Sequence, residues 1–182
     1  MSYRIGLDLG GTKVLGVVTD SDHKVIHRKK HRLSNRADIS AVMDQISNVY
    51  TALAEQVGDE KIDSVGIALP SPVDNELGHA KHLTAFQEKE LPVRDMLKER
   101  TGVDVKLGND VNMATLAEYK FGAGKGVSSL FTFYPGTGLG GGYIYKGKLV
   151  TGFNSTAAEV GHVVIDIDGP LCKCGRHGCL EA

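Results

Sequence analysis

The sequence predicts a mixed α/β fold, and two observations support that prediction. Apolar, β-branched runs alternate with segments of helical periodicity in the order strand, strand, strand, helix, strand, helix, strand, helix. This order is typical of an α/β domain, in which helices pack on a sheet. In addition, the first two runs, residues 4–9 and 13–19, flank Gly10 and Gly11, which is the pattern of a β-hairpin.

The remaining elements of this domain follow in chain order. Residues 24–32 alternate weakly and are expected to form a third antiparallel strand. Apolar residues then recur at helical spacing from Asp38 to Val57, and Gly58 fits a C-cap. We further expect a strand at 62–69 with a loop at 70–72, a short helix at 93–100 closed by Gly102, a strand at 103–107 and a helix at 111–121.

A second, shorter part of the chain is expected after the helix at 111–121. The glycine-rich stretch 122–126 is predicted to be flexible and to mark a domain boundary, so that residues 1–121 and 122–182 form separate domains. Strands are expected at 129–134, 141–145 and 148–151, around a glycine-rich loop, and one more at 163–167.

Composition narrows the class of protein. Hydrophobic residues make up 41% and charged residues 24% of the 182 residues, as in ordinary globular proteins. The net charge of −1 does not indicate nucleic acid or an anionic membrane as a partner. No apolar run approaches the ~20 residues of a membrane-spanning helix, and no signal-peptide pattern is present. Clustered thiols without a secretion signal predict a reducing, cytoplasmic location.

All three cysteines gather near the C-terminal end, at Cys172, Cys174 and Cys179, and His162 precedes them. Three thiolates and an imidazole suit one tetrahedral, structural Zn²⁺ ion. An odd number of cysteines also fits poorly with a disulfide framework. We therefore predict a zinc site. The alternative for His162 is a core histidine whose nitrogens are satisfied within the protein.

Two glycine-rich loops are candidates for phosphate binding. In the first, Asp8 is followed by Gly10, Gly11, Thr12 and Lys13 between two strands. Glycines allow close approach of phosphate oxygens, backbone amides and Thr12 can donate hydrogen bonds, and Asp8 can hold a hydrated Mg²⁺. The alternative is a plain glycine turn.

The second loop, residues 136–142, has five glycines in seven positions. Gly136, Thr137, Gly138 and Gly140 are the positions that we expect to contact a phosphate. A nest of backbone amides for a second phosphate group explains the excess of glycine, and a flexible linker is the alternative.

Three carboxylates complete the candidate site. Asp110 follows Asn109 between a strand and a helix, where it can accept the proton of a sugar hydroxyl that attacks a phosphoryl group. Asp is also a favoured N-cap residue, and the two roles can coexist. Glu159 and Glu181 bracket the predicted zinc site, and bidentate acceptors suit vicinal sugar hydroxyls. The alternative for each glutamate is a solvated surface position.

Together these motifs resemble the ROK family of sugar kinases and related repressors, in particular its bacterial glucokinases. The resemblance extends over the whole chain, and its most specific part is the Cys-x-Cys-Gly-x-x-Gly-Cys-x-Glu stretch at 172–181. It implies an actin-like ATPase (ribonuclease H-like) fold with two α/β domains and with the sugar and ATP in the cleft between them.

The resemblance also implies roles for single residues. Asp110 matches the catalytic base of the family. The sugar-contacting positions are matched by Asn109, Glu159, His162 and Glu181, and the zinc ligands by His162, Cys172, Cys174 and Cys179. Zinc would order the segment that presents the two glutamates rather than act as a Lewis acid. Because relatives are commonly dimers, a homodimer is implied.

The chain departs from the family pattern in three places. The family continues beyond Glu181-Ala182 into helices that receive the adenosine, so we expect one actin-like domain followed by only the start of a second. Thr84-Ala85-Phe86 stands where the family often has Pro-Asn-Leu and then Trp, and Pro135 where Leu is more usual. The last two departures concern the identity of the sugar more than the chemistry.

The function predicted from these residues is ATP-dependent phosphorylation of a hexose hydroxyl, with the 6-position of glucose as the first choice. Polyphosphate is the alternative donor. Residues 8–13, 109–110, 136–142 and 159–181 would surround one cleft. The competing function is a non-catalytic sugar sensor of the repressor branch, without its DNA-binding module. A filament-forming actin relative is a third possibility, in which a zinc cluster has no evident purpose.

Overall fold

The computed structural model describes residues 2–182, which form two compact units, Met1–Asp110 and Val111–Ala182. We call them unit 1 and unit 2. The mixed α/β class predicted from the sequence is confirmed. The division falls after Asp110, whereas the sequence suggests a boundary after residue 121, so most of helix α3 (Asp110–Phe121) belongs to unit 2.

Unit 1 is built on a five-stranded sheet in the order β3-β2-β1-β4-β8. Its strands are β1 (Ser2–Leu9), β2 (Lys13–Thr19), β3 (Val25–Arg32), β4 (Lys61–Leu69) and β8 (Val105–Asn109). The first three strands pair antiparallel, as the hairpin pattern predicts, whereas β1, β4 and β8 run parallel. A single sheet therefore joins the glycine hairpin to the strand that precedes Asp110.

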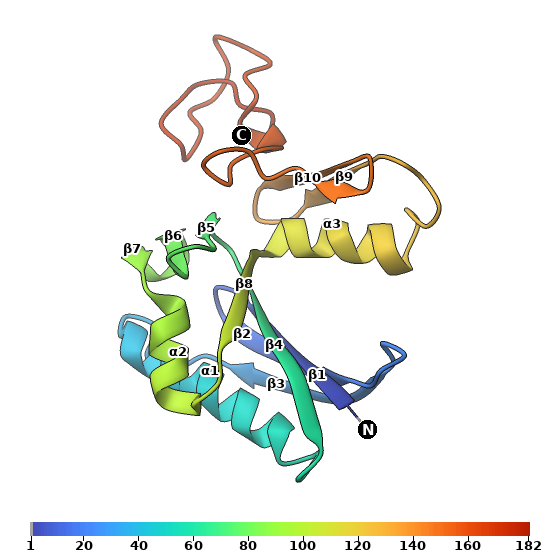
Figure 1. Ribbon diagram of the computed structural model, residues 1–182. Coiled ribbons are helices and arrows are strands. Elements are labelled where there is room, and N and C mark those ends of the chain that lie inside the picture. The colour runs from blue at the N-terminus through green and yellow to red at the C-terminus, as the bar shows by residue number, and fades with distance from the viewer. Residues whose placement is uncertain (1) are drawn as a thin grey trace. The chain divides into compact units, whose positions relative to one another are not determined.

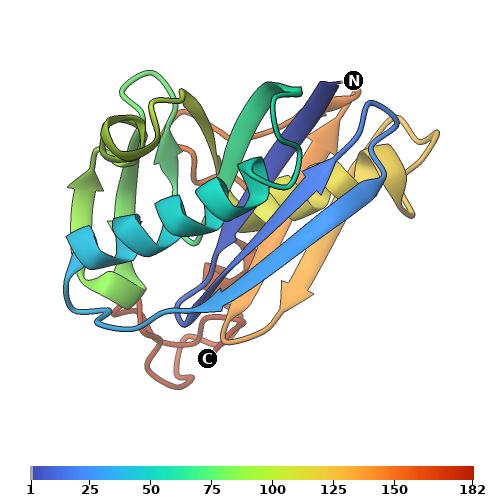
Figure 2. The same ribbon diagram turned by 90° about the horizontal axis from the view of Figure 1, so that it is seen from below.

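Helices α1 (Ile39–Ala54) and α2 (Val93–Thr101) cover one face of this sheet (Figures 1 and 2). Helix α1 begins after Asp38, whose Oδ1 accepts hydrogen bonds from the amides of Ser40 and Ala41 at 2.9 and 3.3 Å. Helix α2 ends at Gly102, which has a φ of +73° and confirms the predicted C-cap. Their apolar sides and the facing strand residues form the main core.

Helix α1 approaches the sheet most closely at Gly16 of β2. A Cβ atom at this position would lie 2.5 Å from Cδ1 of Leu53 and 2.9 Å from Cγ1 of Val49. Both distances are shorter than van der Waals contact, so only glycine fits beneath the helix. The glycine therefore sets how deeply α1 packs on the sheet.

A small second sheet in unit 1 was not predicted. Its strands are β5 (Val73–Asp74), β6 (His79–Leu83) and β7 (Glu88–Leu91), in that order, with a short 3-10 turn at Thr84–Phe86. Strands this short carry almost no periodicity. The turn between β5 and β6 is formed by Asp74, whose Oδ1 accepts the amides of Glu76 and Leu77, both at 3.0 Å.

Unit 2 contains α3 and a three-stranded sheet in the order β11-β10-β9. The strands are β9 (Leu130–Pro135), β10 (Leu139–Tyr145) and β11 (Lys148–Leu149). Helix α3 packs on one face of the sheet, where the hydroxyl oxygens of Thr115 and Thr132 lie 2.5 Å apart. The strands predicted at 129–134, 141–145 and 148–151 are confirmed with small shifts of their ends. Residues 122–126 close the end of α3, because the amides of Gly122 and Gly124 both donate to the Glu118 carbonyl at 3.0 Å.

The opposite face of this sheet carries a row of neighbouring aromatic rings. Phe133 and Phe131 have ring centroids 5.0 Å apart, Phe131 and Tyr143 5.9 Å, and Tyr143 and Tyr145 6.1 Å. Phe133 is 60% exposed and Tyr145 49%. Among residues 111–182, only Ile144, Cys172 and Cys179 are buried hydrophobic side chains. Unit 2 therefore has little apolar core of its own.

The strand predicted at 163–167 is wrong. Only Val164 pairs, in a single bridge with Cys179, and the preceding residues form a 3-10 turn, Val160–His162. Turn chemistry prevails here, because Asp166 accepts the amide of Asp168 through Oδ1 and the amide of Gly169 through its carbonyl, both at 3.1 Å. The apolar run therefore continues into a turn instead of a ladder.

The five-stranded sheet and the β11-β10-β9 sheet each end in an edge strand, and these two edge strands differ in character. In the five-stranded sheet, β3 exposes four cationic side chains, those of Arg28, Lys29, Lys30 and Arg32. In the three-stranded sheet, β9 has no charged residue and exposes Phe131 and Phe133. Across residues 2–182, no helix has the length and apolarity needed to cross a membrane.

Candidate functional site

The parallel strands of unit 1 bring several predicted site residues to one edge of the sheet. In register, Asp8 of β1 pairs with Ala68 of β4, and Leu69 of β4 pairs with Asn109 of β8. Because these strands run parallel, their carboxyl ends lie along the same edge, which is where open α/β sheets bind ligands. Asp8, the glycine hairpin and the Asn109-Asp110 pair therefore share this edge.

Asn109 holds the carboxylate of Asp110 in place. Its Nδ2 donates to Oδ1 of Asp110 at 3.1 Å and to the Ser71 carbonyl at 3.3 Å. Asp110 is the first residue of α3, so its backbone is fixed by the helix and its side chain by Asn109. A carboxylate oriented in this way can accept a proton from a bound hydroxyl.

Ser71 is a site residue that the sequence analysis assigned only to a loop. It is 2% exposed, its Oγ accepts the amide of His82 at 2.9 Å, and its carbonyl accepts from Asn109. Ser71 thus connects the loop after β4 to both β6 and the Asn109-Asp110 pair. Its position two residues after a buried strand was the available signal.

The hairpin between β1 and β2 is held by hydrogen bonds from outside it. The Gly10 amide donates to the Lys13 carbonyl at 2.8 Å within the turn. From the next segment, the Leu33 amide donates to the Thr12 carbonyl at 2.9 Å and Arg36 donates to the Gly11 carbonyl at 2.7 Å. The tip is therefore pre-ordered, as a phosphate-binding loop requires.

Two further features belong to this edge. Surrounding protein raises the pKa of Asp8 by removing water from its carboxyl group, and the positive charge of Lys13 opposes the shift. A Cβ atom at Gly11 would lie 3.3 Å from Cβ of Ala85. The Thr84–Phe86 turn, where the sequence departs from the ROK pattern, therefore lies against the glycine hairpin.

In unit 2, packing accounts for the three consecutive glycines that end the loop 136–142. Gly140, Gly141 and Gly142 lie in β10, not in the turn. A Cβ atom at Gly140 would lie 2.6 Å from Val111, and one at Gly141 2.5 Å from the Ala158 carbonyl. One at Gly142 would overlap Thr115. Close packing against α3 and residues 158–160 therefore explains glycine at 140–142.

The turn itself is formed by Gly136, Thr137 and Gly138. The Gly136 amide donates to the Gly138 carbonyl at 2.8 Å, and a Cβ at Gly136 would meet no neighbour. Glycine at 136 is thus not required by packing, and its contact with a phosphate stays a prediction. Among the predicted phosphate contacts, Gly138 and Gly140 have a packing reason for glycine and Gly136 has none.

Glu159 follows a strained stretch of backbone. Ser155 and Ala158 have φ angles of +59° and +65°, in the left-handed region that side chains with a Cβ rarely adopt. Strain of this kind gathers at functional positions. Glu159 itself is exposed and leads into the Val160–His162 turn, whose last residue belongs to the cysteine cluster.

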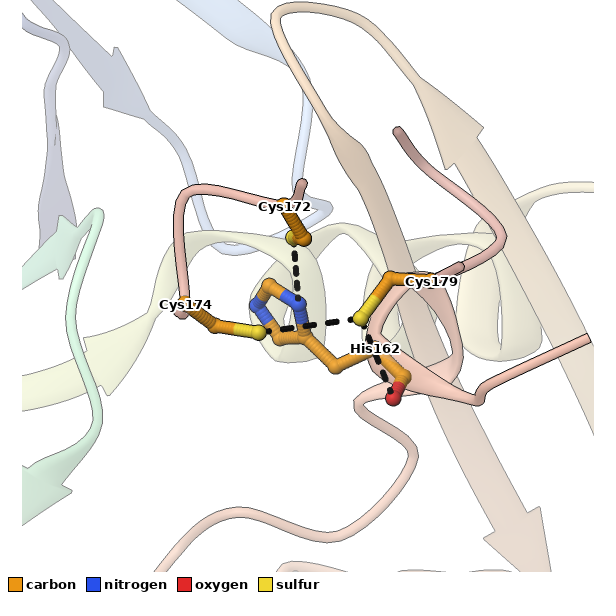
Figure 3. A group of neighbouring side chains, drawn as sticks. All are labelled: His162, Cys172, Cys174 and Cys179. Carbon is orange, nitrogen blue, oxygen red and sulfur yellow. Dashed lines mark hydrogen bonds between the residues drawn. The ribbon is translucent and has the colours of Figure 1, made fainter. Parts of the chain in front are cut away.

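Figure 3 shows the side chains of His162, Cys172, Cys174 and Cys179 converging on one point. Their ligand atoms all lie within 4.8 Å of one another. Sγ of Cys172 is 3.6 Å from Nδ1 of His162, and the sulfurs of Cys174 and Cys179 are 3.6 Å apart. Ligands of a tetrahedral Zn²⁺ with bonds of ~2.3 Å lie ~3.8 Å from each other. The donor set and its spacing are thus consistent with a zinc site.

The thiols of this cluster differ in their environment. The Arg176 amide, hydrogen-bonded to Cys174, lowers the pKa of that exposed thiol to about 6. Burial raises the pKa of Cys179 to about 11. Bound zinc requires thiolates and would remove both protons.

Glu181 lies between the cluster and the glycine loop. Its Oε2 accepts the Leu139 amide at 3.1 Å, while Oε1 lies 3.5 Å from Sγ of Cys172 and 3.8 Å from Nδ1 of His162. The Leu139 hydrogen bond is the main cause of a lowered pKa of Glu181. The side chain is only 14% exposed, so the solvated surface position considered above does not describe it.

The predicted residues therefore gather in two groups. Unit 1 brings together Asp8, the hairpin 10–13 and Asn109-Asp110, and unit 2 brings together the loop 136–142, His162, the three cysteines and Glu181. That both groups enclose one cleft stays a prediction.

Comparison with known proteins shows the family. The ROK family model matches residues 4–182. A glucokinase from Thermotoga maritima is 37% identical over 179 residues, which cover 98% of this chain and 56% of that protein. The crystal structure of a ROK family glucokinase from Streptomyces griseus in complex with glucose and AMPPNP has a TM-score of 0.85 at 33% identity, covering 98% of this chain and 56% of that one.

A repressor also resembles the chain. The DNA-binding transcriptional repressor Mlc of Escherichia coli is 28% identical over 181 residues, which cover 98% of this chain and 45% of the repressor. The chain thus spans about half the length of these relatives, and its fold is the N-terminal part of the actin-like ATPase fold seen in ROK hexokinases. On the match over residues 4–182, the chain belongs to the ROK family.

Proposed function

We propose that this protein is an ATP-dependent sugar kinase that phosphorylates a hexose hydroxyl, with glucose and its 6-position as the first candidate. The observation that carries the proposal is the Asp110 carboxylate, held by Asn109 at the sheet edge that also carries Asp8 and the glycine hairpin. The similarity to glucokinases, one of them bound to glucose and AMPPNP, supports it.

In this proposal the sugar oxygen attacks the γ-phosphorus of ATP, the bond from phosphorus to the bridging oxygen breaks, and ADP leaves. Asp110 accepts the proton of the hydroxyl. Asn109 keeps the carboxylate of Asp110 directed at that hydroxyl. Phosphoryl transfer depends mainly on positioning and on neutralised charge, so a single base and two ordered loops suffice.

The other site residues would bind the phosphates, the sugar and the metal ions. The hairpin 10–13 and the turn 136–138 would donate amide hydrogen bonds to phosphate oxygens. Asp8 would hold Mg²⁺ through water, and Mg²⁺ when bound supplies charge neutralisation on the phosphates. Glu159, His162 and Glu181 would contact sugar hydroxyls. His162, Cys172, Cys174 and Cys179 would hold a structural Zn²⁺, which cross-links a segment with little regular structure.

Replacing Asp110 tests the proposal. In the complete protein expressed from its gene, Asp110→Asn should lower kcat for glucose phosphorylation by roughly 10²–10⁴, the contribution of a general base, with little change in KM. Asp104→Asn is the matched control. Asp104 directly precedes β8, the strand that Asp110 follows, and its side chain is 74% exposed. A coupled assay of ADP formation with several hexoses measures both variants.

A near-parental rate of Asp110→Asn at saturating sugar would show that Asp110 is not the base. The competing function is sugar sensing without catalysis, which the similarity to the repressor favours. It predicts hexose binding by calorimetry with no ADP formed in the parent protein. Cytoplasmic location and a homodimeric assembly stay predictions from the sequence and the family resemblance.

A further inference from the structure

The Glu181 side chain bonds both to the cysteine cluster and to the residue that follows the turn of the glycine loop. One carboxylate oxygen accepts the Leu139 amide at 3.1 Å, directly after the turn 136–138. The other lies 3.5 Å from the sulfur of Cys172. A single rigid carboxylate therefore connects a predicted metal ligand to the start of β10.

The backbone around Glu181 fits against the same turn. The Glu181 amide donates to the Gly161 carbonyl at 3.0 Å. A Cβ atom at Gly161 would overlap the Leu139 carbonyl, and one at Gly138 would overlap the Glu181 carboxylate. Glycines at 138 and 161 thus allow the segment with the cluster to touch the glycine loop directly. A displacement of the cluster segment therefore shifts the glycine loop, and the reverse, because no free space separates their close-packed atoms.

The segment 159–182 has little regular structure and few buried side chains. Its regular structure consists of one 3-10 turn and two isolated bridges. Apart from glycines, only Cys172 and Cys179 are buried in it, whereas Ile165, Ile167 and Leu171 are 65–83% exposed. With so little apolar core, a metal ion bound by the cluster would contribute free energy that orders this segment.

We propose that Glu181 couples metal occupancy of the cluster to the conformation of the turn 136–138. Zinc fixes Cys172 and Cys179, these fix Glu181, and the Glu181 carboxylate holds the Leu139 amide and with it the turn. Glu181 is in this sense a positioning residue for the phosphate loop. The inference deepens the proposed function, because that turn is its second phosphate-binding loop, but the geometry on which it rests lies wholly within unit 2.

Hydrogen exchange tests the coupling without any assay of activity. The purified chain is freed of metal with a chelator and compared with the chain reloaded with one equivalent of Zn²⁺. Site-resolved mass spectrometry should show exchange of the Leu139 amide slowed about tenfold or more by zinc, as expected for a hydrogen bond to a charged acceptor that forms only in the loaded state. Exchange in 159–182 should slow as well.

Three variants make the result specific to Glu181. Glu181→Ala should keep one zinc per chain and the protection of 159–180, yet lose the zinc-dependent protection of Leu139. Glu181→Gln retains an oxygen acceptor and should restore part of it. Asp168→Asn, an exposed acidic position in the same segment, should behave as the parent.

Two results would overturn the proposal. One is zinc-dependent protection of Leu139 that persists in Glu181→Ala. The other is a parent chain in which zinc protects 159–182 and leaves 136–142 unchanged. Neither result depends on kinase activity, so the coupling can fail while Asp110→Asn still lowers kcat as predicted, and the reverse.

Discussion

The sulfurs of Cys174 and Cys179 lie 3.6 Å apart, but the pKa values of the two thiols are shifted in opposite directions. Cys174 is exposed, and the Arg176 amide stabilises its thiolate, whereas Cys179 is buried and its neutral thiol is favoured. In the metal-free chain, the thiolate of Cys174 is therefore populated above a pH of about 6 and lost as the pH falls through that value, while Cys179 stays protonated up to about 11. Alkylating reagents attack only thiolates, so the two residues can be separated by pH.

We predict that iodoacetamide modifies metal-free Cys174 with half-maximal rate near pH 6 and leaves Cys179 unmodified across neutral pH. One equivalent of Zn²⁺ should suppress the modification of Cys174, because its sulfur becomes a ligand. Peptide mapping by mass spectrometry measures each cysteine. Parallel titration of Cys174 and Cys179 near pH 8.5, with no effect of zinc, would contradict both the assigned environment and the site.

At the scale of residues, the sequence was most informative about side chains that lie close together along the chain. Cys172, Cys174, Cys179 and His162 do meet, as their clustering predicts. The hydrogen bond from the Leu139 amide to Glu181 joins positions 42 residues apart, and no local sequence pattern predicts it. Ser71 was missed for the same reason, since its partners His82 and Asn109 come from distant segments.

At the scale of elements, the glycines within strands differ in whether packing excludes a side chain at their position. Gly16 of β2 lies under α1, where a Cβ would come within 2.5 Å of Leu53. Gly66 of β4 would place a Cβ 3.7 Å from the Lys106 carbonyl, an ordinary contact. Both are glycines in the same sheet, so they form a matched pair for substitution.

Gly16→Ala should lower the free energy of unfolding by about 1–3 kcal/mol, because the added methyl group overpacks the interface between α1 and the sheet. Gly66→Ala should change it by less than about 1 kcal/mol, since no atom must move. Urea unfolding followed by circular dichroism gives both values. Equal effects of the two substitutions would mean that α1 does not pack as closely on β2 as the structure shows.

Elements with strong periodicity or clear end signals were predicted best. Helix α1 has a buried stripe and an Asp38 cap, and α2 has a Gly102 cap, so their limits differ from prediction by only a few residues. The β5–β7 sheet has strands too short to show alternation. The run 163–167 looks like a strand but has no neighbouring strand to pair with, and a strand needs a partner for its backbone groups.

At the scale of the whole molecule, apolar side chains are unevenly distributed. Unit 1 has a continuous buried core, whereas unit 2 leaves Phe133, Phe153 and Ile167 between 60% and 103% exposed. Exposed apolar side chains, where they lie next to one another as in the aromatic row of β9 and β10, bind dyes and promote association. No sequence pattern separates these residues from core residues, because exposure depends on which surfaces meet.

We predict that Phe133→Lys lowers the fluorescence of bound ANS and raises the concentration at which the protein begins to scatter light. A charge at this position interrupts the aromatic row and the uncharged β9 edge. Val25→Lys serves as control, since Val25 lies on the already cationic β3. If both variants behave alike, the β9 face is not the apolar surface that the dye recognises.

The charges on β3 have a consequence for assembly by backbone pairing. Two copies that approached through this strand would bring eight cationic side chains into one narrow ribbon, four from each copy. Coulomb repulsion opposes such pairing at low ionic strength, and it fades when the Debye length falls to ~3 Å in molar salt. Molar salt would therefore remove the electrostatic barrier to pairing at the β3 edge. It would leave the β9 edge unchanged, because β9 has no charged residue to screen.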